Sequence, residues 1–181
     1  MLIHITADND DALSLPVTFA AGDQIDLDED ATITSQADDG IFGPAAANGA
    51  TMTLLGSIQA GKSAVCALSG GHAITIGSNG SLYGSFSGIL LDENGDEVGG
   101  NIVQNSGSVG TSMVALGPYG IAISAHSSNN QVLNTGTISG YLGVTLGLGA
   151  FSFSPPAIPS SPPPRTTASS TAARSTRRPL P

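Results

Sequence analysis

Apolar residues and small polar residues alternate along most of the chain, in short runs separated by glycine, asparagine and serine. An alternation with a period of two predicts β-strands, because successive side chains of a strand point to opposite faces. Glycine and asparagine between the runs predict turns, since both residues accept positive φ angles at low cost. The pattern therefore predicts an all-β chain made of many short strands.

One phrase recurs in the middle of the chain. Residues Asn101–Gly110 and Asn130–Gly140 share the pattern N-x-V-x-N-[ST]-G-[ST]-[VI], and weaker copies occupy 73–84 and 51–59. The four copies align on one glycine each, at intervals of 24, 27 and 29 residues: Gly56, Gly80, Gly107 and Gly136. An internal repeat of this length is typical of solenoids, in which each unit packs on the next.

Each unit also contains a third apolar run after its glycine, at 64–67, 88–91, 120–123 and 143–146. Three short strands per unit of about 25 residues predict a right-handed parallel β-helix of four to five short coils. The inward residues of one coil should stack on those of the next: Val103, Val109 and Ile121 on Val132, Ile138 and Val144. Asn105 and Asn134 should form a short amide ladder at one corner.

An antiparallel β-sandwich is the alternative all-β fold, because its strands also recur every 8–12 residues or so. A sandwich gives no reason for the phrase N-[ST]-G-[ST]-[VI] to recur, so we favour the β-helix.

The phrase N-T-G-T-I-S-G at Asn134–Gly140, followed by G-V-x-L at 143–146, resembles repeats of large secreted bacterial β-helix proteins. Some of these are adhesin-like or autotransporter-like passengers, and others are haemolysin-type calcium-binding proteins. The resemblance covers about residues 50–150 and implies a secreted or cell-surface location. The haemolysin-type nonapeptide G-G-x-G-x-D is absent, since Gly99-Gly100-Asn101-Ile102 departs from it. The N-terminus also lacks the basic start and apolar stretch of a signal peptide.

Composition divides the chain into unlike parts. Fourteen acidic residues and Lys62 give residues 1–150 a net charge of −13, whereas 151–181 carry four arginines, no acid and 8 of the 11 prolines. We therefore predict an N-terminal cap or irregular first coil at 1–50, β-helix repeats at 51–153, and a disordered tail at 154–181. The tail is rich in Ala, Pro, Arg, Ser and Thr, a composition that a GC-rich gene gives when it is read out of frame. A frameshift is therefore a second hypothesis for the tail.

The sharpest apparent motif is Gly56–Ser63, a literal match to the P-loop pattern G-x-x-x-x-G-K-[ST]. Leu68–Gly71 resembles the signature of ABC-type ATPases, and Ile89–Glu93 resembles their Walker B strand. A P-loop must open a helix, however, and the next residues break after five positions. The eight-residue spacing from Gly56 to the following run recurs after Gly80. These fragments are better explained as parts of two coils, and nucleotide binding is the least favoured function.

Acidic clusters raise a calcium hypothesis. Asp92, Asn94 and Asp96 place oxygen ligands at alternate positions, but Glu97 and Val103 stand where an EF-hand loop needs glycine and glutamate. A looser calcium site in an outward loop is the cofactor hypothesis, and a solvated turn is the simpler explanation. The cluster Asp26–Asp30 could instead discourage pairing along an edge strand.

No catalytic, cofactor-binding or metal-ligating residue is assigned from the sequence. His4, His72 and His126 are too scattered for zinc ligands, and Cys66 is most simply a small core residue. Nucleic acid is a poor partner for an acidic body with three tyrosines and no tryptophan. No apolar run reaches the roughly 18 residues of a membrane-spanning helix.

These observations favour a non-enzymatic structural or adhesive β-helix segment, in a fragment of a larger secreted protein. Its partners would be cell-surface or carbohydrate ligands, because stacked strands give a long surface rich in serine, threonine and asparagine. The alternative is a polysaccharide lyase or hydrolase, since carbohydrate-active enzymes also use this architecture. Such an enzyme needs clustered acids and a basic residue, and Lys62 is the single base in residues 1–150.

Overall fold

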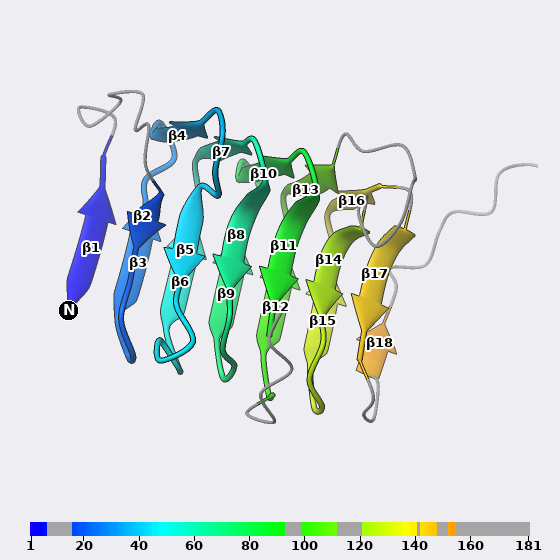
Figure 1. Ribbon diagram of the computed structural model, residues 1–181. Coiled ribbons are helices and arrows are strands. Elements are labelled where there is room, and N and C mark those ends of the chain that lie inside the picture. Colours follow the sequence, from blue (N-terminus) through cyan, green and yellow to red (C-terminus); the bar gives the residue numbers. More distant parts are fainter. Residues whose placement is uncertain (7–15, 93–98, 112–120, 141, 148–151, 155–181) are drawn as a thin grey trace, which may run out of the picture.

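A computed structural model of the chain describes residues 1–6, 16–92, 99–111, 121–140, 142–147 and 152–154 (Figure 1). These residues form 18 short strands, and none of them lies in a helix. All strand pairs between them are parallel. The predicted parallel β-solenoid is therefore confirmed, and the antiparallel sandwich is wrong for the described residues.

The strands belong to three sheets that run the length of the solenoid (Figure 1). Sheet A contains β1 (Leu2–Ile5), β3 (Gln24–Leu27), β6 (Thr51–Leu54), β9 (Ala73–Ile76), β12 (Ile102–Asn105), β15 (Gln131–Asn134) and β18 (Ser152–Ser154). Sheet B contains β2 (Val17–Thr18), β5 (Ile41–Gly43), β8 (Ser63–Ala67), β11 (Ser87–Leu91), β14 (Ile121–Ala125) and β17 (Leu142–Leu146). Sheet C contains β4 (Thr32–Ser35), β7 (Ser57–Ala60), β10 (Ser81–Gly84), β13 (Ser108–Thr111) and β16 (Thr137–Ser139).

The chain visits sheets A, C and B in turn, which makes five complete coils from β3 to β17. Within these coils each strand pairs with the corresponding strands of the adjacent coils, so coils contact only their neighbours. In Figure 1 the strands of sheet C run along the top, and those of sheets A and B form the two long sides.

The core is a narrow stack of aliphatic rows, one or two from each sheet. In sheet A, Ile25, Met52, Ile74, Val103 and Val132 are in register and buried. In sheet C the buried row is Ile33, Ile58, Leu82 and Val109, which continues to the partly buried Ile138. A single coil could not bury these side chains, so the stack is the source of the core.

The four aligned glycines occupy one position of the coil, immediately before a strand of sheet C. The register joins Ser57, Ser81, Ser108 and Thr137, which confirms the alignment that the sequence predicted. A Cβ atom on Gly107 would lie 2.2 Å from the carbonyl oxygen of Gly80 in the preceding coil. Glycine is required here because the backbones of two coils approach too closely for a side chain.

The third run of each unit is a strand of sheet B, as predicted, but one stacking assignment is wrong. Ile123 pairs with both Ile89 and Val144, whereas Ile121 pairs with Ser87 and Leu142. The residue that stacks on Val144 is therefore Ile123, two residues later than predicted. The longer insertion between Gly107 and this run hides the register from a comparison of spacings.

The described part of residues 1–50, predicted as an N-terminal cap or irregular first coil, contains strands β1 to β5. Strands β3, β4 and β5 form a complete coil there, and β1 and β2 extend sheets A and B beyond it. In β5 the side chain of Ile41 is fully buried. Asp26 lies on β3, which pairs on both sides, so its proposed role on an edge strand is wrong. The predicted tail from 155 onward lies outside the described residues.

Two polar columns follow the corners of sheet A. The amide of Asn105 donates through Nδ2 to Oδ1 of Asn134 at 2.7 Å, which confirms the predicted ladder. At the other corner, Nδ1 of His72 accepts the N–H of Ala50, Oδ1 of Asn101 accepts that of His72, and Oδ1 of Asn130 accepts that of Asn101. Each of these side chains satisfies a buried backbone donor of the preceding coil. We call Ala50, His72, Asn101 and Asn130 the corner column.

Candidate functional site

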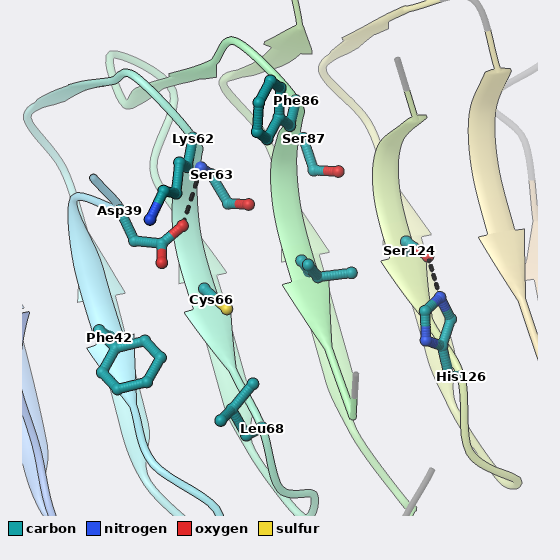
Figure 2. A pocket seen from close by; sticks show the side chains of 11 residues that line it. Asp39, Phe42, Lys62, Ser63, Cys66, Leu68, Phe86, Ser87, Ser124 and His126 are labelled. Carbon is teal, nitrogen blue, oxygen red and sulfur yellow. Dashed lines mark hydrogen bonds between the residues drawn. The ribbon is translucent and has the colours of Figure 1, made fainter. Parts of the chain in front are cut away.

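A groove of about 440 Å³ lies on the outer face of sheet B (Figure 2). It crosses β5, β8, β11 and β14, so it draws side chains from four successive coils. Its described lining consists of Asp39, Phe42, Lys62, Ser63, Cys66, Leu68, Phe86, Ser87, Leu90, Ser124 and His126.

The floor of the groove is one row of outward side chains in register. Phe42 pairs with Cys66, Cys66 with Leu90, and Leu90 with Ser124. Phe42 and Leu90 are partly exposed, and Cys66 is buried. The corresponding outward rows of sheets A and C are mostly threonine, serine and glutamine, such as Thr53, Thr75 and Gln104. Sheet B therefore differs from the other faces in presenting an apolar strip.

Charged groups line one end of the groove, at the corner that leads from sheet C into sheet B. Oδ1 of Asp39 accepts the backbone N–H of Ser63 at 2.9 Å (Figure 2). Burial raises the pKa of the Asp39 carboxyl, although the Ser63 amide and the nearby Lys62 charge partly oppose that rise. Nζ of Lys62 lies 2.7 Å from Oδ1 of Asp38, and this pairing raises the pKa of Lys62.

A second polar pair lies on the coil at the far side of the groove. Oγ of Ser124 and Nε2 of His126 are 3.0 Å apart in a hydrogen bond (Figure 2). Ser124 is buried within β14, whereas His126 follows the strand and is exposed. The groove thus has an apolar floor with hydrogen-bonding groups at both sides.

Cys66 was predicted to be a small core residue, and this is only partly right. Its exposed fraction is 4%, but it faces the groove rather than the aliphatic interior, which Val65 and Ala67 fill. The alternation in the sequence could not tell the groove face of β8 from its core face, because the residues on both faces are buried.

The apparent P-loop does not have the structure of one. Residues 57–60 form β7 and residues 63–67 form β8, where a P-loop has a phosphate-binding loop followed by a helix. Lys62 lies at the corner between them and pairs with Asp38. The prediction that this motif and the Walker-B-like fragment are ordinary parts of two coils is confirmed, since Ile89–Leu91 lies in β11 of the next coil.

The first residue of the acidic cluster, Asp92, is fully buried at the end of β11 with a φ of 56°. Its Oδ2 accepts hydrogen bonds from Nδ2 of Asn101 and Oγ of Ser127, so it belongs to the corner of sheet A. Asn94 and Asp96 lie outside the described residues, and the calcium hypothesis stays a prediction. In the described part of the chain, no three His, Cys, Asp or Glu side chains are close enough to share a metal ion.

The three histidines lie in separate parts of the molecule. His4 contacts Asp28 across sheet A, with Nε2 2.9 Å from Oδ1, and His126 contacts Ser124. His72 is buried in the corner column, where its ring meets Phe19 edge-on and its Nε2 lies 3.0 Å from the carbonyl oxygen of Ser69. Desolvation lowers the pKa of His72. The sequence had indicated that these residues are too scattered for one site.

The groove itself was not predicted. Its lining comes from residues about one coil apart, and neither Phe42 nor Asp39 stands in a recognisable motif. One signal was present: the third run of each unit has apolar residues at consecutive positions, as in Gly88–Leu91, instead of strict alternation. Such a run is typical of a strand that is covered on both faces.

Comparisons of the chain with protein-family models, curated proteins and solved structures find no match. The resemblance to secreted bacterial adhesins thus rests on the repeat phrase alone. Among the described residues there is also no helix that could cross a lipid bilayer.

Proposed function

We propose that the chain is a non-enzymatic structural or adhesive segment of a secreted or cell-surface β-helix protein. The observation that supports this is the regular spacing of its outer side chains. Sheet A presents rows such as Thr53, Thr75 and Gln104, in which each hydroxyl or amide lies one strand spacing, about 4.8 Å, from the next. Rows of this kind give many weak, repeated hydrogen bonds to an extended partner.

The experiment is retention of the purified full chain on surfaces coated with polysaccharides or whole bacterial cells, with an assay for released reducing ends. We expect retention without release. The double variant Thr75→Arg with Gln104→Arg should reduce retention, because two long charged side chains cover the row. Thr75→Ser with Gln104→Asn is the matched control and should be retained. Failure to bind any of these surfaces would contradict the adhesive proposal.

A carbohydrate-active enzyme is the second candidate, because Asp39 is a groove carboxyl whose pKa is raised by burial. Glycosidases use two carboxylates about 5–9.5 Å apart, and the described lining of the groove contains one. Release of reducing ends that is lost in Asp39→Asn would favour the enzyme over the adhesive segment.

A further inference from the structure

The groove of sheet B has the dimensions of a small-molecule site rather than of a flat adhesive face. Adjacent strands are about 4.8 Å apart, so the three steps from β5 to β14 span about 14 Å. Its volume of about 440 Å³ falls within the range of roughly 300–1,000 Å³ that is usual for ligand pockets. A groove of this length and width accommodates an elongated ligand of a few linked rings.

The arrangement of apolar and polar groups specifies the chemistry of that ligand. Phe42 and Leu90 form an apolar floor, and Phe86 adds a second ring at the edge. Hydroxyls line the sides at Ser63, Ser87 and Ser124 (Figure 2). A sugar ring has the same division, with C–H groups on its faces and hydroxyls around its rim. Aromatic faces carry partial negative charge, which favours contact with such C–H groups.

The charges in and around the groove favour a neutral sugar over an acidic one. The groove carboxylate, Asp39, has one oxygen bonded to the Ser63 amide, and the groove cation, Lys62, is paired with Asp38 outside the lining. The chain as a whole has a net charge of −9. A polymer of uronic acids would bring further carboxylates toward Asp39 and into this negative field, which disfavours its binding.

We infer that the groove of sheet B binds a short, uncharged oligosaccharide, with a ring stacked on Phe42 and Leu90 and its hydroxyls bonded to Asp39, Ser87 and Ser124. This inference rests on the proposed adhesive function, to which it adds a second binding face, on sheet B, and a specific ligand class. It assigns to Asp39 the role of a hydrogen-bond acceptor from a sugar hydroxyl through its second oxygen. Asp39 is a binding group here and performs no bond cleavage.

Tryptophan fluorescence tests the inference in the full chain, because the natural sequence contains no tryptophan. Phe42→Trp places the single reporter on the groove floor, and Tyr83→Trp places the matched control on the exposed face of sheet C. The probes are cellotriose, maltotriose and chitotriose, with trigalacturonate as the acidic comparison. We expect one or more of the neutral trisaccharides to change the Phe42→Trp emission in a saturable way and to leave Tyr83→Trp unchanged.

A second set of variants tests the hydrogen bonds. Ser87→Ala and Ser124→Ala, each made in the Phe42→Trp background, should weaken the binding of the same trisaccharide about three- to tenfold. Ser78→Ala, at an exposed turn away from the groove, is the control and should leave binding unchanged.

No response of Phe42→Trp to any of the three neutral trisaccharides up to their solubility limits overturns the inference. Tighter binding of trigalacturonate, or equal responses of the two reporters, overturns it as well. If the chain is retained on polysaccharide surfaces while the groove reporter is silent, the adhesive function stands and the groove assignment fails. If the reporter responds but no surface retains the chain, the adhesive function fails and the groove assignment stands.

Discussion

In the first three complete coils, strands β3, β6 and β9 end on the buried residues Leu27, Leu54 and Ile76, whereas in the next two, β12 and β15 end on Asn105 and Asn134. All five residues occupy the same inward row of sheet A. The corner column changes along the same direction, from Ala50 and His72 to Asn101 and Asn130.

We call the coils from β3 to β11 the apolar half and those from β12 to β17 the asparagine half. Together they show that one backbone position can be stabilised in two different ways. The leucine and isoleucine side chains gain from apolar burial, while Asn105 bonds the amide of Gly107, the side chain of Asn134 and the carbonyl of Thr137. The two asparagines of this row are partners of each other across adjacent coils. The stabilising unit in this row is therefore a pair of adjacent coils rather than a single residue.

Leu54→Asn should have the largest effect, because it places an amide between Leu27 and Ile76, neither of which can bond it. We expect a loss of about 5 kcal/mol in unfolding free energy, from the lost apolar volume and the unpaired amide together. Leu54→Met, which nearly conserves volume, should cost less than about 1.5 kcal/mol. Urea denaturation measures both, and equal losses would mean that the row is not selective for apolar side chains.

Gly107→Ala and Gly56→Ala should cost about the same in both halves, roughly 3 kcal/mol each, because the close approach of coils is common to them. The added Cβ would lie 2.2 Å from the carbonyl oxygen of Gly80 in the first case and of Ala31 in the second. Gly22→Ala is the control, since Gly22 has a φ of 70° and open space around it, and should cost about 1–2 kcal/mol. Chemical denaturation gives the values, and a large difference between the first two would show that the halves pack differently.

Asn105→Leu should cost about 2 kcal/mol, because it leaves Oδ1 of Asn134 and the Gly107 amide without their partner. Adding Asn134→Leu should cost less than the same change made alone, since two leucines restore the packing of the apolar half. A double-mutant cycle in urea should give a coupling of about 1 kcal/mol. Strict additivity would show that the two amides act independently.

His72 should make the wild-type chain sensitive to mild acid, although this effect is the smallest. Burial lowers its pKa in the folded state below the ordinary value of 6.5, so the unfolded chain takes up a proton first as the pH falls. The contribution of neutral His72 to the free energy of unfolding is therefore fully present above about pH 6.5. It declines below that pH, until the pH falls past the lowered pKa of His72 in the folded chain. His72→Asn, which extends the asparagines of the corner column, should remove this decline.

The measurement is the difference in melting temperature between the wild type and His72→Asn from about pH 8 to pH 5. Taking the difference cancels the contribution of the carboxyl groups to the pH dependence of the melting temperature. Asp39 is one of them, and its raised pKa acts in the opposite direction to the lowered pKa of His72. A difference that does not change with pH would show that His72 is protonated equally in the folded and unfolded chains.

Local chemistry made much of the fold predictable. Gly107 and its equivalents mark where coils approach, and Asn105 and Asn134 mark a ladder, because each of these features depends on residues at one position of a repeat. The prediction failed where an insertion changed the spacing, as with Ile121 and Ile123, and where strand β5 followed no repeat phrase.

The sequence by itself determined that the chain is a β-solenoid, because alternation sets the strands and recurring glycines set the coils. It could not determine the groove, since Asp39, Phe42, Leu90 and Ser124 belong to three different coils and share no motif. Only the stacking of coils decides which outward side chains become neighbours, and a shift of one residue in register would move each of them to the other face. The tertiary structure therefore decided where the groove lies and which side chains line it.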